Sequence, residues 1–324
     1  MSWQRVAGSA TGGAVLDTGA PGTWDDQVVG MPTVLRDAQG TYRMWFVGIH
    51  TVAPGGNVYV ENGSVGLATS SDGVNWTRAN SGLPVFVRGD SGAFDSTAVF
   101  HPFVALVNGM YYMWYGGADG TQGWNSVRVE RIGLATSTDG VNWTRANRGQ
   151  PVLDIGADGS SDSIQATGMH VLHDGRRFLM WYGAYDGLHS IVAAESPDGI
   201  HWSRLNGGRP VTGLEPTPVG VLGPAVYFDG SRFLMLYSRL VDQQWQLFGA
   251  ASDDGIAWRT VYSGDALIGP NSGTAFDAAG PGRNLAVHPS QLLIENGKAS
   301  LWYTGEETAE TGRQRIGLLQ GDLR

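Results

Sequence analysis

One recurring segment constrains the fold of this chain more than any other feature. The sequence GLATSSDGVNWTR runs from Gly66 to Arg78 and returns almost unchanged, as GLATSTDGVNWTR, from Gly133 to Arg145. Weaker copies occupy residues 193–204 and 249–259, and an Asp-Gly pair aligns in all four. Self-similarity at a long, regular spacing is typical of solenoids, propellers and other repeat architectures.

A second repeat lies upstream of each copy and supplies a fifth unit. Its apolar and aromatic runs occupy residues 41–48, 111–117, 177–184, 232–238 and 299–305. Asn-Gly and Asp-Gly pairs separate runs of strand length, which is the strongest local signal for a β-hairpin. Helical periodicity is absent, and four strands per repeat of this length are typical of a propeller blade. The sequence therefore predicts an all-β fold, a five-bladed β-propeller.

The two ends of the chain predict how the ring closes. The fifth copy ends with its third strand, near residues 315–318, while Trp3-Gln4-Arg5-Val6 at the start matches the fourth-strand segment that begins at Trp76. The N-terminal strand should therefore complete the last blade and cover an edge that would otherwise be free. This arrangement predicts one domain over residues 1–324, without a linker.

Composition excludes several classes of function. The chain has no cysteine, which removes disulfides, thiolate metal sites and cysteine nucleophiles. Its net charge is −9 with no basic run, which argues against a nucleic-acid or anionic-membrane partner. No apolar stretch reaches the length of a membrane span. The first residues lack the apolar core of a secretory signal, so a cytoplasmic location is expected.

The connections that vary between repeats fall on one face of the expected ring. They lie at residues 49–64, 118–130, 240–245 and 306–314, whereas the opposite turns are short. Variable loops on a rigid scaffold are where binding sites are commonly built. We therefore expect the functional site on this face. Features that recur in every blade are expected to be structural, and those that differ at equivalent positions are functional candidates.

Aspartates recur just before the innermost strands, at Asp25, Asp95, Asp162 and Asp277. They either cap backbone N–H groups of the loops or contribute to substrate binding. The tryptophan that follows each Asp-Gly pair is expected to be a core residue between blades.

Three motifs together resemble a known superfamily. The chain reads Trp-Asp-x6-Pro-x-Val from Trp24, Tyr-x-Met-Trp-Phe-x-Gly from Tyr42, and then the recurring segment from Gly66. Over essentially the whole chain this pattern resembles the five-bladed propellers of the arabinanase, β-xylosidase, levansucrase and invertase superfamily. The resemblance implies a glycoside hydrolase-like activity with three carboxylates in the central funnel: an Asp in blade 1, an Asp before a proline in blade 2, and a Glu in blade 3.

The chain departs from that pattern at all three positions. Met31 precedes Pro32, His101 precedes Pro102, and blade 3 has the segment Gln165–Met169 where a glutamate is expected. Glycoside cleavage needs a pair of carboxylates. Either these come from other positions, or the chain does not carry out the hydrolysis.

Residues that break the repeat supply the candidate site. His101 and His288 both precede proline in the expected inner strands, where they would act in acid–base chemistry or ligand binding, or would only bond a neighbouring loop. The candidate catalytic residues are Asp26, His101, Glu215, His288 and Glu306. The candidate substrate-binding residues are Trp24, Asp25, Asp95, Asp162, Arg283 and Trp124.

These residues favour a carbohydrate-active enzyme, glycoside hydrolase-like, that acts in the funnel. The alternatives are a non-hydrolytic propeller that binds a sugar or another small molecule, and a tailoring enzyme that uses funnel histidines. We expect no cofactor; relatives implied by the resemblance include some with a calcium ion on the axis. The expected partner is a carbohydrate or small-molecule ligand, and the sequence does not specify an oligomeric state.

Overall fold

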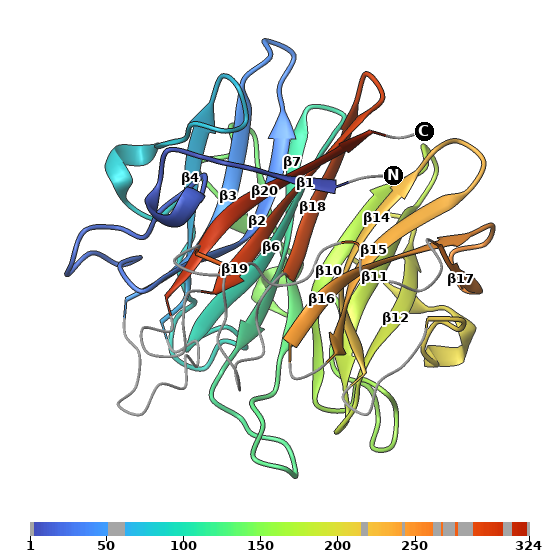
Figure 1. The fold of residues 1–324 in the computed structure, drawn as a ribbon. Helices are drawn as coiled ribbons and strands as arrows, with labels where there is room; N and C mark the ends of the chain where they lie inside the picture. The colour runs from blue at the N-terminus through green and yellow to red at the C-terminus, as the bar shows by residue number, and fades with distance from the viewer. Residues whose placement is uncertain are drawn as a thin grey trace.

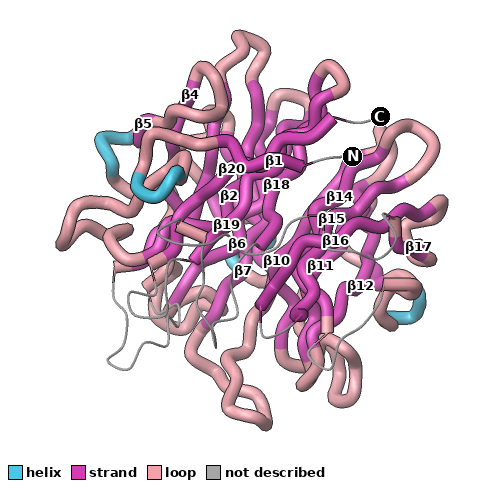
Figure 2. Tube along the Cα trace, in the orientation of Figure 1, coloured by secondary structure: helices cyan, strands magenta, loops and turns pink. Residues whose placement is uncertain are grey.

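A computed structural model of the chain describes residues 3–50, 62–214, 220–241, 244–261, 267, 276–277, 288–306 and 313–322; the side chains of Gln244 and His288 are outside this description. Within these residues, strands and loops make up nearly the whole structure, and short 3-10 turns lie at its periphery (Figure 2). The 3-10 turns follow the outermost strands of four blades: η1 (Thr11–Gly13), η2 (Asn80–Gly82), η3 (Asn147–Gly149) and η4 (Asn206–Gly208).

Twenty described strands form five blades of four antiparallel strands each (Figure 1). Blade 1 contains β2 (Val28–Arg36), β3 (Tyr42–Ile49), β4 (Ser64–Ser70) and β5 (Thr77–Arg78). Blade 2 contains β6 (Ala98–Val107), β7 (Met110–Ala118), β8 (Arg131–Ser137) and β9 (Thr144–Arg145). Blade 3 contains β10 (Gln165–His173), β11 (Phe178–Tyr185), β12 (His189–Ser196) and β13 (Ser203–Arg204). Blade 4 contains β14 (Val221–Phe228), β15 (Phe233–Val241), β16 (Gln244–Ser252) and β17 (Trp258–Thr260). Blade 5 contains β18 (His288–Glu295), β19 (Lys298–Glu306), β20 (Gln314–Asp322) and β1 (Trp3–Val6).

The first strand of every blade faces the centre, and these five inner strands form a closed cycle. Strand β2 contacts β6, β6 contacts β10, β10 contacts β14, β14 contacts β18, and β18 contacts β2. The predicted five-bladed propeller is therefore confirmed. The edge of the ring at which the inner strands begin carries the long, variable connections, and we call it the mouth.

The predicted closure of the ring by the N-terminal strand is also confirmed. Strand β1 pairs antiparallel with β20, with Trp3 opposite Gly321 and Val6 opposite Leu318. Strands β1 and β20 consequently lie side by side in Figure 1. The pairing covers the outer edge of β20, which would otherwise present unpaired backbone groups to solvent.

A tryptophan in the second strand of four blades links each of these blades to the next one. In blade 5, the indole N–H of Trp302 donates to the carbonyl of Gly73 in blade 1 at 3.1 Å. Gly73 belongs to an Asp-Gly turn and has a φ of 75°, where a Cβ would lie 3.2 Å from the Trp302 ring. Equivalent bonds join Trp45 to Gly140, Trp114 to Gly199 and Trp181 to Gly255. The repeated Asp-Gly therefore forms a turn and also accepts a buried indole N–H.

The interface between blades 4 and 5 lacks this link because blade 4 has Leu236 at the tryptophan position. An apolar cavity of about 30 Å³ lies there, with Leu236, Trp3 and Leu292 among its lining residues. The buried indole N–H of Trp3 has no hydrogen-bond partner. Trp3 belongs to β1, so the strand that closes the ring within blade 5 also forms part of this interface.

Candidate functional site

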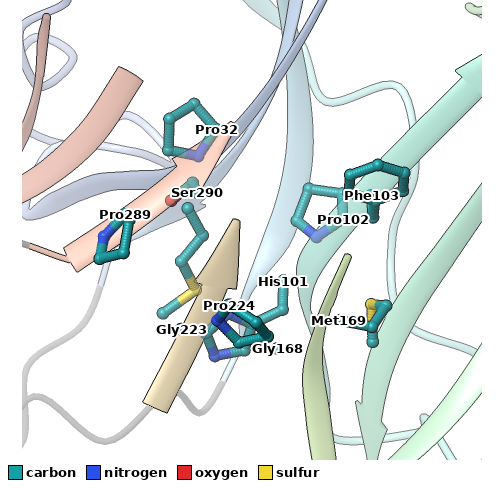
Figure 3. A pocket seen from close by; sticks show the side chains of 11 residues that line it. Pro32, His101, Pro102, Phe103, Gly168, Met169, Gly223, Pro224, Pro289 and Ser290 are labelled. Atoms are coloured by element: carbon teal, nitrogen blue, oxygen red, sulfur yellow. The ribbon is translucent and has the colours of Figure 1, made fainter. Parts of the chain in front are cut away.

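The inner strands enclose a small cavity on the axis of the ring (Figure 3). Its volume is about 30 Å³, and all five inner strands contribute to its wall: Met31, Pro32, His101, Pro102, Phe103, Gly168, Met169, Gly223, Pro224, Pro289 and Ser290. This volume holds about one water molecule, whereas small-molecule sites usually have several hundred cubic ångströms. A molecule much larger than water therefore does not fit inside this cavity and could lie only above it, towards the mouth.

A β-bulge in the middle of the inner strands shapes the cavity wall. The pairing register shifts in blades 1 to 4 at residues with positive φ: Met31 (52°), His101 (48°), Gly168 (58°) and Gly223 (66°). A non-glycine residue in this region costs on the order of 1–2 kcal/mol. The neighbouring blade holds Met31 in place, since its backbone N–H donates to Oγ1 of Thr304 at 2.7 Å. Bulges of this kind redirect side chains beside functional sites.

His101 contributes its side chain to the cavity wall and is partly exposed. Its ring packs edge-on against Phe100, with 5.6 Å between ring centroids. Blade 3 has Gly168 at the facing position, where a Cβ would lie 3.8 Å from Nδ1 of His101. The glycine thus leaves space beside a titratable ring on the axis.

The pairing register corrects the expectation that His288 is equivalent to His101. His288 pairs with Thr304, one residue beyond Tyr303, whereas Phe100 pairs with Gly116, one residue beyond Tyr115. His288 is therefore equivalent to Phe100 and not to His101. The length of the bulge is the same, since His288 and Gln291 pair with Thr304 and Trp302 as Phe100 and Phe103 pair with Gly116 and Trp114. The cause is the proline, which stands one position earlier in blade 5, so that Pro289 is equivalent to His101.

At the mouth, five equivalent positions at or next to the start of the third strands form a second ring. The pairing registers align five positions there: Gly63, Glu130, His189, Trp245 and Gln314. Three of them bridge to the inner strand of the next blade, Glu130 to Gln165, His189 to Gly220 and Gln314 to Val28. This position is structurally equivalent around the ring but chemically different in each blade, which is the pattern expected of functional residues.

Glu130 is a buried carboxylate at this position and was missed as a candidate in the sequence. It is 5% exposed and accepts two hydrogen bonds from the Arg128 guanidinium, at 2.5 and 3.2 Å. The guanidinium lies over the Phe100 ring, 4.7 Å from its centroid. Phe100 in turn contacts His101, so this ion pair is connected to the wall of the axial cavity through a single aromatic ring.

Asp26 is held at the junction of blades 5 and 1, just before β2. It accepts hydrogen bonds from the backbone N–H of Gly22 at 2.6 Å and from Nδ1 of His50 at 2.9 Å. Burial alone would raise its pKa, but these two partners and the charge of Arg313 hold the pKa of the carboxyl below its usual value. Asp26 is thus ionised at neutral pH.

Glu306 lies at the same junction, at the end of β19. Its side chain is 3% exposed, and it pairs across the sheet with Gln314. The backbone N–H of Gln314 donates to the carbonyl of Gln27, the residue after Asp26, at 3.3 Å. The structure therefore places two buried carboxylates at one junction at the mouth, from Asp26 and Glu306.

An aromatic cluster occupies the mouth between blades 3 and 4. His189 lies 4.6 Å from Tyr185 and 6.1 Å from Trp245, measured between ring centroids. Burial lowers the pKa of His189 to about 4, so the ring is neutral near pH 7. Trp245 is itself only 4% exposed, so its indole is packed within this cluster. By contrast, Trp124 in the β7–β8 connection is 77% exposed.

The recurring aspartates are enclosed by their own blades and do not line the axial cavity. Asp162 is 0% exposed; Tyr182 donates its hydroxyl to it at 2.7 Å and Arg204 its Nε–H at 2.8 Å. Arginines of the fourth strands make the same contact in three other blades, pairing Arg78 with Asp25, Arg145 with Asp95 and Arg5 with Asp277. Side chains thus bond to these carboxylates where backbone N–H groups were expected. This burial argues against substrate binding by Asp25, Asp95 and Asp162, and we propose a structural role for them instead.

The indole of Trp24 is also packed against neighbouring residues. It stacks on Phe46 at 5.8 Å and donates its N–H to the carbonyl of Gly82 at 2.7 Å. The equivalent residues Phe94 and Phe276 are buried core residues. An indole that is packed and hydrogen-bonded in this way offers little surface to a sugar.

Two predicted site residues, Glu215 and Arg283, lie outside the described residues, as does the His288 side chain. Within the described part of the chain, no group of three His, Asp or Glu side chains is placed to hold a metal ion. No helix among the described residues is long and apolar enough to span a membrane.

No family model matches the chain, and no curated protein matches its sequence. Solved structures with the same fold are nonetheless numerous. One, a complex of BT0996 with RGII, superimposes with a TM-score of 0.73 at 20% identity and covers 98% of this chain and 92% of its own. A putative glycoside hydrolase from Parabacteroides distasonis gives a TM-score of 0.70 at 16% identity, covering 98% and 96%. A thermostable family-43 glycoside hydrolase gives 0.64 at 15% identity, covering 96% and 90%. The resemblance inferred from the sequence motifs is thus confirmed at the level of the fold: this chain has the five-bladed propeller of these glycoside hydrolases along nearly its whole length.

Proposed function

We propose that this protein is a glycoside hydrolase-like enzyme that binds a carbohydrate at the mouth of the propeller. The observation that carries the proposal is the junction of blades 5 and 1, where backbone pairing joins the segments that carry the buried carboxylates Asp26 and Glu306. The fold shared with glycoside hydrolases supports the proposal as an analogy, because one fold can host unrelated functions.

The two carboxylates suit the two roles that glycoside cleavage needs. In the inverting form of the reaction, one carboxylic acid gives its proton to the glycosidic oxygen as the bond to the leaving group breaks. The other, ionised, carboxylate takes a proton from the water whose oxygen bonds to the anomeric carbon. Asp26 is the ionised group because its partners lower its pKa. We assign the role of proton donor to Glu306, the other buried carboxyl group at this junction.

The remaining mouth residues fit substrate positioning. The Arg128–Glu130 ion pair presents a charged donor and a charged acceptor beside His101. Sugar hydroxyl groups both donate and accept hydrogen bonds, and charge-assisted bonds of this kind are the stronger ones. We assign these residues to holding the sugar and not to the bond-breaking step.

The proposal is tested with a panel of 4-nitrophenyl furanosides and pyranosides of both anomeric configurations, each at several pH values. Asp26→Asn and Glu306→Gln should each lower turnover by about 100-fold or more, because general acid–base groups contribute about that much. Glu195→Gln is the matched control, since Glu195 lies on the third strand of blade 3, away from the mouth, and forms an ion pair with Arg177. Melting temperatures show whether each variant is folded. Full turnover in folded Asp26→Asn and Glu306→Gln would refute the assignment.

A second candidate function, sugar binding without hydrolysis, is favoured by the axial cavity itself. Its wall contains Met31, His101 and Gly168, and none of these positions has a carboxylate. This alternative predicts that calorimetry detects glycoside binding while no glycoside of the panel is cleaved. If His101 takes part in either function, the ligand affinity or the reaction rate should change between pH 5 and 8. His101→Gln should remove that dependence.

A further inference from the structure

Trp124 is the most exposed large apolar side chain among the described residues, at 77%. Most of the other described tryptophans are buried, including Trp45, Trp114 and Trp302 at 0–1% exposure. Leaving such a ring in water forgoes roughly 1.5–3 kcal/mol of apolar burial. The β7–β8 connection that carries Trp124 has no counterpart of the same sequence in the other blades. In Figure 1 this connection extends beyond the mouth.

The loop holds the indole on a defined hairpin. Gln122 and Arg128 form a bridge, Gly123 donates its N–H to Val127 at 2.8 Å, and Val129 donates its N–H to Thr121 at 2.8 Å. A ring on such a support loses little conformational freedom when a ligand binds, which lowers the entropic cost of binding.

Blade 3 braces the hairpin from the side. The amide Nδ2 of Asn125 donates to the hydroxyl of Tyr185 at 3.3 Å. Gly187 has a φ of 122°, and a Cβ there would lie 3.4 Å from the Trp124 ring. The glycine therefore allows the blade 3 loop to approach the indole closely, next to an amide and a phenol that can both bond to hydroxyl groups.

The same hairpin reaches back to the axis. Arg128 closes it and places its guanidinium over Phe100, which contacts His101 in the cavity wall. A line of contacting side chains thus runs from the axial cavity through Phe100 and Arg128 to the base of the hairpin that carries Trp124. A ligand that fills the mouth and continues along this line meets the indole next.

We infer that Trp124, with Asn125 and Tyr185, forms a subsite for a further sugar ring of an oligosaccharide whose first ring occupies the mouth. One face of a sugar ring carries C–H groups and can stack on an indole, while its hydroxyl groups bond to neighbouring polar side chains. The substrate class is thereby an oligosaccharide of at least two units. This inference rests on the proposed carbohydrate site.

The test measures affinity against chain length. Calorimetry uses methyl glycosides and arabino-, xylo- and manno-oligosaccharides of one to five units, with the full chain and with Trp124→Ala, Trp124→Phe and Leu83→Ala. Trp124→Ala should weaken oligosaccharide binding about tenfold, which is what the loss of one good aromatic contact amounts to, and should leave methyl glycoside binding unchanged. Trp124→Phe should recover most of the affinity. Leu83→Ala is the control, because Leu83 is also exposed, at 61%, but lies beside the peripheral turn η2.

A second readout does not depend on catalysis. The exposed indole should react first with N-bromosuccinimide, and a bound oligosaccharide should protect it. The subsite would be overturned if the parent and Trp124→Ala bound every oligosaccharide with equal affinity and no oligosaccharide protected the indole. In that case the proposed function would still stand, as long as short glycosides bind or are cleaved. If no carbohydrate of any length binds the parent chain, the proposed function fails and the subsite with it.

Discussion

At the scale of single residues, a buried aspartate that bonds to an arginine of the fourth strand helps to hold four of the blades together. Asp162 has no solvent exposure and depends on Arg204 and Tyr182 for its hydrogen bonds. Water cannot replace either partner at such a position, so removing Arg204 would leave the charge of Asp162 buried and uncompensated.

Replacing Asp162 therefore tests whether the recurring aspartates are structural. Asp162→Ala should destabilise the protein by about 1–3 kcal/mol, because the buried hydroxyl of Tyr182 would lose its acceptor, and denaturant unfolding measures this change. Activity per folded molecule should be unchanged. A variant as stable as the parent but inactive would instead place Asp162 in the site.

At the scale of strands, the sequence predicted the architecture well because the repeats encode it directly. Asn108-Gly109 and the recurring Asp-Gly pairs form the turns that were expected, with both Asn108 and Gly109 at positive φ. The match of Trp3–Val6 to a fourth strand was sufficient to predict ring closure. These signals are local, and local signals dominate where turn chemistry and apolar pattern agree.

The site was less predictable because it depends on register and partners. His288 precedes a proline as His101 does, but that proline stands one position earlier in the bulge of blade 5, so aligning the blades on their prolines misplaces His288 by one residue. Glu130 was overlooked because it stands at the end of a variable loop in the sequence. Comparing it with His189 and Gln314 at the aligned position would have identified it. The arginine partners of the aspartates do recur in sequence, at Arg78 and Arg145 for example, and were available as a signal.

The N-terminal strand can be tested as an element. Deleting residues 1–19 removes β1, the buried residues Val15 and Leu16, and the ion pair between Arg5 and Asp277. The truncated chain should aggregate or lose its cooperative unfolding transition, as followed by circular dichroism and light scattering, because the edge of β20 becomes free. Gln4→Ala, at an exposed position of β1, should unfold like the parent. Cooperative melting of the truncated chain at the parent's temperature would contradict this role for β1.

The whole molecule should respond to acid through its buried histidines. Burial lowers the pKa of His170 to about 3 from an ordinary value of 6.5, although a backbone hydrogen bond at Val226 opposes the shift. Below pH 6.5 the unfolded chain binds a proton that the folded chain excludes. Stability is therefore complete above pH 6.5 and is lost as the pH falls towards 3, with a slope of up to about 1.4 kcal/mol per pH unit for this one group.

The measurement is the free energy of unfolding between pH 7 and 4.5, above the range where most carboxylates titrate. His170→Gln should have a shallower dependence than the parent, and glutamine already occupies the equivalent position in blade 5, at Gln291. His201→Gln, at a side chain that is 79% exposed, should retain the parent slope. An identical slope in His170→Gln would show that His170 does not titrate as inferred.

The pairing of β1 with β20 has a consequence for how the protein is made. Ribosomes add roughly 5–20 residues per second, so the first strand waits on the order of 15–60 seconds before its partner is synthesised. During that time Trp3 has no blade to pack into, and the ring stays open because blade 5 is incomplete. The nascent chain therefore carries an unpaired strand until β20 has been made, and the last residues of β20 turn an open row of blades into a closed ring.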